Sequence, residues 1–211
     1  MKLHWYGHSC FEVNNREGKR LLFDPFNEKV GYHVPDFLAD VVTTSHGHYD
    51  HANVDAVKGE YVLVQGPVMH ACCGFYVVGY PSFHDDENGT IRGNNTVFVV
   101  TTDDMTICHL GDLGHVLPKE TLEAIGKVDV LLLPVGGGYT VDAEKAEIIR
   151  KQINPRYTVP MHYKTADCTL GIETIRPYLD LVGEASVCYV GNDICLEDLQ
   201  VDSKILVMSY Q

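Results

Sequence analysis

The segment Thr-Ser-His-Gly-His-Tyr-Asp-His at residues 44–51 gathers three imidazoles and one carboxylate within six positions. Imidazole is the commonest metal ligand in proteins, and carboxylates suit divalent cations. Residues two apart in an extended chain project to the same side, so His46 and His48 can point at one ion. Asp50 and His51 follow where the chain turns and can reach a second ion. Chance placement yields this pattern roughly 0.002 times in such a chain, which favours a metal site over a solvated histidine-rich loop.

The elements that must position these residues are mostly strands. Short apolar runs rich in Val, Ile, Leu, Phe and Tyr recur between turn signals. We expect strands at residues 3–6, 10–13, 20–23, 41–45, 61–65, 75–79, 96–102, 105–110, 128–134, 156–161, 186–190 and 204–208. The run 128–134 is nearly all apolar, which indicates a strand covered on both faces. The metal-binding pattern therefore follows directly after a predicted strand.

Helices are fewer and lie mostly in the second half of the chain. The patterns predict them at residues 52–58, 119–126, 143–153 and 172–182. Asp142 can cap the third helix, and Pro177 interrupts the fourth. The stretch 85–95, rich in glycine and asparagine, predicts an exposed loop. Strands first, then strands alternating with helices, indicate facing sheets with helices outside.

The segment at residues 44–52 resembles the signature of the metallo-β-lactamase superfamily, and further residues match that family in order. His84 matches the third histidine of the first metal, and Asp112 in His-Leu-Gly-Asp matches an aspartate that bridges the metals. His162, at the end of a late strand, matches the last histidine. The resemblance spans residues 3–163.

Three other segments are similar to one branch of that superfamily. They are Trp-Tyr-Gly-His-Ser-Cys-Phe at 5–11, Leu-Phe-Asp-Pro-Phe at 22–26 and the glycine-rich segment 134–142. This branch contains the ascorbate-6-phosphate lactonase and many small, uncharacterised metal-dependent hydrolases.

The resemblance implies an α/β fold for a single domain over residues 1–211. That fold is a four-layer αβ/βα sandwich of two mixed β-sheets with helices on the outer faces. It also implies two metal ions that share a water and lower its pKa, so that hydroxide attacks a carbonyl carbon or a phosphorus. Asp50 is expected to orient this nucleophile as well as to bind metal. The implied ligands are His46, His48 and His84 for the first ion, Asp50, His51 and His162 for the second, and Asp112 between them.

Two residues near the start of the chain are candidates for supporting roles. In the superfamily an aspartate at the position of Asp24 orients a ligand histidine, and the alternative is a turn aspartate that bonds local backbone. His8 lies in a Gly-His-Ser turn between two predicted strands. It is a candidate to contact substrate or donate a proton, and otherwise it is a structural turn residue.

Three residues near the later motifs are weaker candidates. Thr140 follows the glycines at 136–138, which either bring backbone close to a ligand or permit a tight turn. Tyr163 and Lys164 follow His162 and are candidates to bind an anionic group of the substrate.

Composition narrows the partners. The chain has 211 residues with 16 Lys+Arg and 29 Asp+Glu, giving a net charge of −13. This charge disfavours nucleic acid, because phosphate contacts need clustered Lys and Arg. The sequence has no apolar run of the roughly 18–20 residues that a membrane span requires and no signal-peptide pattern. Its seven cysteines form no Cys-x-x-Cys motif, and together these features predict a cytoplasmic protein.

The favoured function is metal-dependent hydrolysis of a small anionic ester, lactone or phosphoester. The alternatives are a nuclease or phosphodiesterase acting on nucleic acid, a non-hydrolytic iron oxidoreductase, and a metal-binding protein without turnover. Nitrogen-rich ligation favours Zn²⁺, and the same donors can hold Mn²⁺, Fe or Ni²⁺. The sequence leaves the substrate and the oligomeric state open, a homo-oligomer included.

Overall fold

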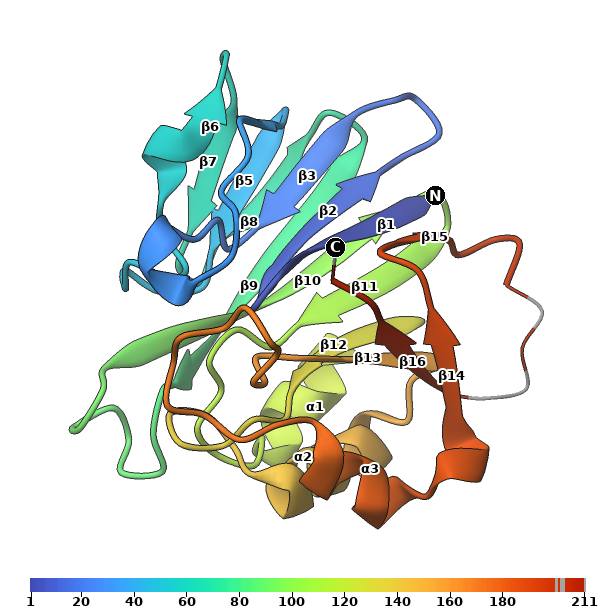
Figure 1. The fold of residues 1–211 in the computed structure, drawn as a ribbon. Coiled ribbons are helices and arrows are strands. Elements are labelled where there is room, and N and C mark those ends of the chain that lie inside the picture. The colour runs from blue at the N-terminus through green and yellow to red at the C-terminus, as the bar shows by residue number, and fades with distance from the viewer. Residues whose placement is uncertain (200, 202–203, 211) are drawn as a thin grey trace.

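Two β-sheets face each other across the main hydrophobic core (Figure 1). The structure is a computed structural model that describes residues 1–199, 201 and 204–210. A short two-stranded ribbon flanks the first sheet and pairs β4 (Phe37–Leu38) with β6 (Val57–Lys58).

The first sheet has six strands and is mixed. Its first four strands are antiparallel, and β3, β5 and β7 are parallel. In spatial order the strands are β15 (Asp193–Cys195), β1 (Lys2–Gly7), β2 (Cys10–Asn14), β3 (Arg20–Phe23), β5 (Val41–Thr44) and β7 (Val62–Gln65).

The second sheet has eight strands and is also mixed. Strands β14, β16, β13, β12 and β11 are parallel, and β10, β9 and β8 continue the sheet in antiparallel fashion. In spatial order they are β14 (Val187–Val190), β16 (Ile205–Met208), β13 (Tyr157–Met161), β12 (Val130–Pro134), β11 (Met105–His109), β10 (Asn94–Thr102), β9 (Phe75–Phe83) and β8 (Met69–Cys72).

Alternation along the strands divides the apolar residues between two clusters. On β3, Leu21 and Phe23 face the main core, whereas Leu22 joins a second cluster with Phe26 and Phe37 on the other face of the sheet. The all-apolar β12 is buried along its whole length. The six-stranded sheet covers one of its faces and the helices cover the other (Figure 1), as expected for a strand covered on both faces.

The α-helices lie on the outer face of the eight-stranded sheet (Figure 1). They are α1 (Lys119–Ile125), α2 (Ala143–Ile153) and α3 (Arg176–Val182). The prediction for α2 is confirmed at both ends. The fourth predicted helix starts later than expected, because Pro177 occupies its first turn, where proline is favoured, rather than interrupting it. None of the described helices is long and apolar enough to cross a membrane.

The outer face of the six-stranded sheet carries no α-helix within the described part of the chain, in contrast to the expected second helical layer. The helix predicted at 52–58 is wrong: this stretch forms a single 3-10 turn, Val54–Ala56, and then β6. The connection from β3 to β5 covers the sheet with the apolar side chains of Phe26, Val30 and Phe37 instead. Pro25 and Pro35 lie in this connection and disfavour a continuous helix.

The fold brings the ends of several strands to one edge. The segments that follow β3, β5, β11 and β13 begin with Asp24, Ser45, Leu110 and His162. Side chains that follow parallel strands meet at the carboxyl edge of a sheet, which is where open α/β sheets bind ligands. The expected metal ligands are therefore carried by loops anchored on the ends of buried strands.

The cap of α2 makes the first testable prediction. Asp142 accepts a hydrogen bond from the backbone N–H of Lys145 at 2.8 Å. We expect Asp142→Ala to lower the free energy of unfolding by about 1 kcal/mol and the Tm by about 2–4 °C. Asp142→Asn keeps a capping oxygen and should stay close to the wild type in thermal denaturation. Equal losses in the two variants would show that the cap contributes nothing.

Candidate metal centre

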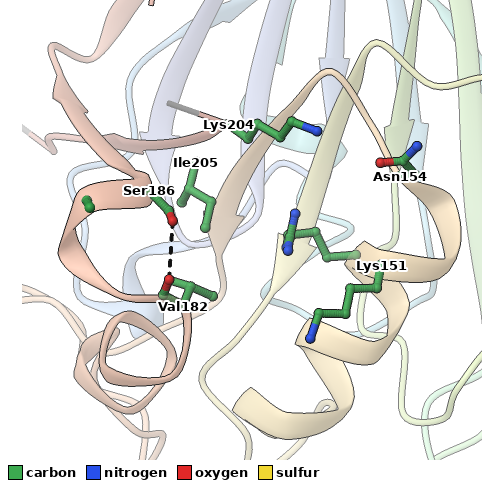
Figure 2. A pocket seen from close by; sticks show the side chains of 8 residues that line it. Lys151, Asn154, Val182, Ser186, Lys204 and Ile205 are labelled. Carbon is green, nitrogen blue, oxygen red and sulfur yellow. Dashed lines mark hydrogen bonds between the residues drawn. The ribbon is translucent and has the colours of Figure 1, made fainter. Parts of the chain in front are cut away.

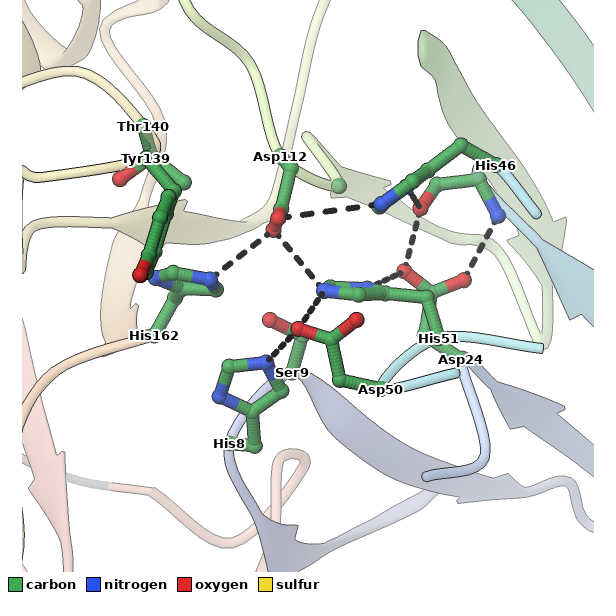
Figure 3. Close-up of polar contacts among 12 residues, drawn as sticks. His8, Ser9, Asp24, His46, Asp50, His51, Asp112, Tyr139, Thr140 and His162 are labelled. Atoms are coloured by element: carbon green, nitrogen blue, oxygen red, sulfur yellow. Dashed lines mark hydrogen bonds and ion pairs between the residues drawn. The ribbon is translucent and has the colours of Figure 1, made fainter. Parts of the chain in front are cut away.

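The seven expected ligand residues gather at the edge described above. The imidazoles of His46, His48 and His84 form one cluster, in which the potential ligand atoms lie within 4.8 Å of one another. A second cluster joins Asp50, His51 and His162 with His8 on the same criterion. Figure 3 shows most of these side chains arranged around Asp112. The structure thus brings together the residues of both expected sets.

Asp112 lies between the two clusters, with one carboxylate oxygen toward each. Its Oδ2 is 3.1 Å from His84 Nε2 and 3.8 Å from His46 Nε2. Its Oδ1 is 3.1 Å from His51 Nε2 and 3.3 Å from His162 Nε2. A carboxylate in this position can contact one cation with each oxygen.

Asp24 holds two of the histidines in place. Its carboxylate accepts hydrogen bonds from His51 Nδ1 at 2.7 Å and from the backbone N–H of Ser45 at 2.7 Å. The Ser45 hydroxyl donates to the same carboxylate at 2.6 Å and lies 2.9 Å from His46 Nδ1. Because that hydroxyl donates to Asp24, it accepts from His46. Both imidazoles therefore carry their proton on Nδ1 and present Nε2 to Asp112.

The loop after β12 fixes a third histidine. His84 Nδ1 donates to the carbonyl of Tyr139 at 3.1 Å, which leaves its Nε2 unprotonated beside Asp112. Gly136 donates its N–H to the carbonyl of His162 at 3.1 Å, and a Cβ at Gly136 would collide with that oxygen. The glycines thus allow a close approach of backbone to the centre. The hydroxyl of Thr140 donates to the carbonyl of Val141 in the same loop and not to a group of the metal centre.

The charges of the centre keep Asp112 ionised and favour a positive charge beside its carboxylate. Burial alone would raise the pKa of this carboxyl, but His162 and His51 outweigh burial and hold it well below its usual range. Burial would likewise lower the pKa of His51, yet Asp112 and Asp24 raise it well above its usual value. Burial lowers the pKa of His46 to about 3 and keeps this imidazole neutral. This environment therefore favours a proton or a cation between the buried carboxylates and His51.

Several buried atoms of the centre have no hydrogen-bond partner among the residues that the structure describes. They include Nε2 of His46, His51 and His162, and Oδ1 of Asp112. Leaving a buried polar atom unpaired costs about 1–3 kcal/mol, so a group that binds these atoms is needed. Neutral imidazole nitrogens and carboxylate oxygens are the donor set of divalent transition metals. The residues present fit such ions.

A cleft of about 540 Å³ opens onto the centre. Four of the expected ligands line it, namely His48, Asp50, His84 and Asp112. The rest of its wall is formed by Tyr49, Tyr139, Leu170 and residues 89–93. The expected ligands therefore lie where a small molecule can reach them.

Arg92 is the one lysine or arginine among the described residues that line the cleft. Its guanidinium lies over the ring of Tyr139, 5.4 Å from the centroid, and donates to the carbonyl of Gly138 at 3.3 Å. The loop that carries Arg92 is fixed by Asp85, whose carboxylate accepts four backbone N–H bonds, from Glu87, Gly89, Ile91 and Arg92. The predicted exposed loop is thus an ordered wall of the cleft.

The structure does not bring Tyr163 and Lys164 into the cleft. Tyr163 is buried in the main core, where its ring lies 5.6 Å from that of Trp5. Lys164 donates its Nζ to the carbonyl of Leu170 at 2.8 Å. Both residues were weaker candidates for binding an anionic substrate group. In the structure Tyr163 packs in the core and Lys164 bonds a neighbouring loop instead.

A second cavity, of about 500 Å³, lies between the ends of α2 and α3 and the start of β16 (Figure 2). Its lining includes Arg150, Lys151, Asn154 and Lys204. Arg150 and Lys151 are already paired with Glu147, and no candidate metal ligand lines this cavity. Among the described residues, the clusters of candidate metal ligands therefore lie at the cleft beside Asp112.

Sequence reasoning missed three residues of the site. Ser45 and Tyr139 act through a hydroxyl and a backbone carbonyl, and no pattern in the sequence marks such contacts. Arg92 lies in a stretch rich in glycine and asparagine, which indicates only a loop. A single arginine in such a loop, far from the motifs along the chain, gives no signal that it faces them.

The bonds of Asp24 predict its effect on metal affinity. We expect Asp24→Asn to weaken Zn²⁺ binding by about tenfold to a hundredfold, because the amide cannot accept from His51 and Ser45 as the carboxylate does. Asparagine tolerates the positive φ of Asp24, which is 45°. Competition with a chromogenic chelator measures the affinity.

Asp40→Asn is the matched control for this experiment. Asp40 also accepts a backbone N–H, from Arg20 at 2.9 Å, and belongs to neither ligand cluster. An equal weakening in both variants would mean that Asp24 has no specific effect on the centre.

Comparison with known proteins places this fold and site in a family. The family model of the beta-lactamase superfamily domain matches residues 2–162, a range that contains all seven expected ligands. A UPF0173 metal-dependent hydrolase from Carboxydothermus hydrogenoformans is 31% identical, over 78% of this chain and 85% of its own. Another from Bacillus cereus is 30% identical, over 78% and 86%.

A crystal structure from Thermotoga maritima shows the same architecture. That protein, provisionally assigned as a Zn-dependent hydrolase of the metallo-β-lactamase superfamily, is 36% identical to this chain. The two superpose with a TM-score of 0.83 over 100% of this chain and 99% of the other. This confirms the expected α/β fold of two mixed sheets. The chain belongs to the UPF0173 metal-dependent hydrolase family of the metallo-β-lactamase superfamily.

Proposed function

We propose that this metal-dependent hydrolase cleaves a small anionic ester, lactone or phosphoester at a pair of divalent ions. One observation carries the proposal. The two carboxylate oxygens of Asp112 face separate clusters of nitrogen and oxygen donors at the base of one cleft. A mononuclear site would need only one of these clusters.

The residues of the centre divide the work in the proposed mechanism. His46, His48 and His84 would hold one ion, Asp50, His51 and His162 the other, and Asp112 both. When bound, such a pair supplies a water of lowered pKa and polarises the scissile bond. Asp50 lines the cleft, so its carboxylate is placed to orient the attacking water by accepting a hydrogen bond. Asp24 keeps His51 in the required tautomer and orientation.

Zinc is the ion that we propose. Five imidazoles and two carboxylates form a nitrogen-rich donor set, which favours Zn²⁺, although Mn²⁺, Fe and Ni²⁺ suit the same ligands. The Thermotoga maritima relative is assigned as Zn-dependent, which supports zinc here.

Arg92 supports an anionic substrate. Arg92 is half-buried in the cleft wall, and none of the described carboxylates lies within ion-pair distance of its guanidinium. Arginine binds carboxylate and phosphate groups through paired N–H donors. The net charge of −13 and this single arginine in the cleft support a small anion rather than nucleic acid. The similarity of residues 5–11 and 134–142 to the lactonase branch supports a lactone as one candidate.

A substrate panel tests the proposed activity. Zinc-loaded protein should hydrolyse members of a panel of lactones, bis-p-nitrophenyl phosphate and small phosphate monoesters. Asp112→Ala and His48→Ala should each lose at least about a hundredfold in kcat/KM, about 3 kcal/mol of transition-state stabilisation. Full activity in either variant would refute the mechanism.

The panel also carries its control and its alternative. The control is Asp129→Asn. Asp129 precedes β12 in the eight-stranded sheet, at the end away from Asp112, and accepts the N–H of Thr106 at 2.9 Å. This variant should keep wild-type activity. Structured RNA is the last member of the panel. Cleavage of RNA with steeply salt-dependent binding would replace the small-molecule proposal by a nuclease.

The position of Arg92 in the cleft predicts that the protein prefers anionic substrates over neutral ones. Two esters with the same leaving group can measure this preference. We expect Arg92→Gln to raise KM for p-nitrophenyl hemisuccinate about tenfold, the value of roughly 1.4 kcal/mol in binding. The KM for neutral p-nitrophenyl butyrate should stay unchanged. Arg92→Lys keeps the charge and should lie between wild type and Arg92→Gln. Equal changes for the two esters would exclude anion recognition by this residue.

A further inference from the structure

His8 lies inside the metal centre rather than on the surface of its turn. It follows β1, and its side chain is fully buried. Its ring centroid is 4.3 Å from that of His162 and 5.0 Å from that of His51 (Figure 3). The imidazole therefore touches two residues of the second ligand cluster.

Neither ring nitrogen of His8 has a hydrogen-bond partner among the described residues. The Nε2 atom lies 3.4 Å from Oδ2 of Asp50, which is longer than ordinary N–H···O bonds of 2.7–3.2 Å. A fully buried imidazole without a partner is costly. The geometry leaves the Nε2 lone pair or proton directed at the space shared with Asp50, His51 and His162.

The backbone fixes this direction at an energetic cost. His8 has a φ of 51°, in the left-handed region that non-glycine residues rarely adopt. Its carbonyl accepts two hydrogen bonds, from Trp5 Nε1 at 3.1 Å and from the N–H of His162 at 3.2 Å. Gly7 precedes it with a φ of 103°, and a Cβ there would collide with the ring of Tyr32. Strain of this kind persists where the surrounding structure requires it, often at functional sites.

We propose that His8 is an additional protein ligand of the second metal position, beside Asp50, His51 and His162. The inference rests on the two-ion centre of the proposed function and adds a ligand to the set that the sequence motifs imply. Four donors besides Asp112 would then enclose the second ion, whereas three histidines serve the first. His48 of the first cluster is exposed and lines the cleft. The two ions would therefore be unequal, because the second would have one more protein ligand than the first.

The competing role for His8 is a hydrogen bond to Asp50 that only positions this carboxylate. Metal binding separates the two roles, because a ligand contributes to one of two binding steps and its ring nitrogen senses the ion directly. Zn²⁺ titration of the full chain in competition with a chromogenic chelator measures both steps. Histidine ring ¹⁵N spectra of the wild type, recorded with and without Zn²⁺, report on the His8 nitrogens.

The variant for this test is His8→Asn, because asparagine adopts the left-handed conformation readily. We expect it to weaken one of the two Zn²⁺ binding steps by at least about tenfold and to leave the other unchanged. His48→Ala should weaken the other step. His70→Asn, which changes an exposed histidine on β8, is the control and should change neither. In the wild type, Zn²⁺ should shift a His8 ring nitrogen signal as it shifts that of His162.

Two results would overturn the inference, and they differ in meaning. In the first, both Zn²⁺ binding steps of His8→Asn are unchanged and the His8 ring signals of the wild type do not shift on addition of Zn²⁺. His8 would then be a positioning residue, and the two-ion centre would stand. Fewer than two ions bound by the wild type would refute the two-ion centre itself, and the inference with it. If His8→Asn does not fold, the ring spectra of the wild type alone decide, since they need no substitution.

Discussion

Several polar atoms at the centre of this protein are buried and face one another instead of water or a backbone partner. Six imidazoles and the carboxylate of Asp50 meet around Asp112, and the unpaired atoms among them would be costly if nothing bound them. The rest of the structure can be understood from this requirement. Two sheets with an extensive apolar core offset the cost of gathering these groups, and a positive charge between them completes the arrangement.

The ligands come from loops, but the positions of these loops are set by strands. The ligands His46, Asp112 and His162, and Asp24 that holds His51, follow four different strands of the two sheets. A slip of one residue in a strand would turn its side chains to the opposite face. The buried alternation on β3, with Leu21 and Phe23 inward and Leu22 outward, prevents such a slip. The precision of the centre is therefore a property of the core beneath it.

Much of this could be predicted from the sequence, since closely spaced ligands and regular periodicity are local signals. The cluster at 46–51 and the amphipathic α2 are read directly from the chain. Contacts between distant segments are different. Arg92 reaches the cleft only because Asp85 folds its loop, and Tyr163 is buried because it meets Trp5. The apolar cover of the six-stranded sheet comes from the connection between β3 and β5, which holds Pro25 and Pro35, and not from a helix at residues 52–58.

His84 and Asp85 are neighbours with separate tasks, and this has a consequence for how the protein can diversify. His84 belongs to the metal centre, while Asp85 holds the path of the following residues by four backbone bonds that involve no side chain of the loop. The side chain of Ile91, which lines the cleft, can therefore be exchanged without loss of these bonds. The Asp85 carboxylate thus holds the loop backbone independently of the side chain at position 91. Substitutions there can change the wall of the cleft while the neighbouring ligand His84 keeps its place.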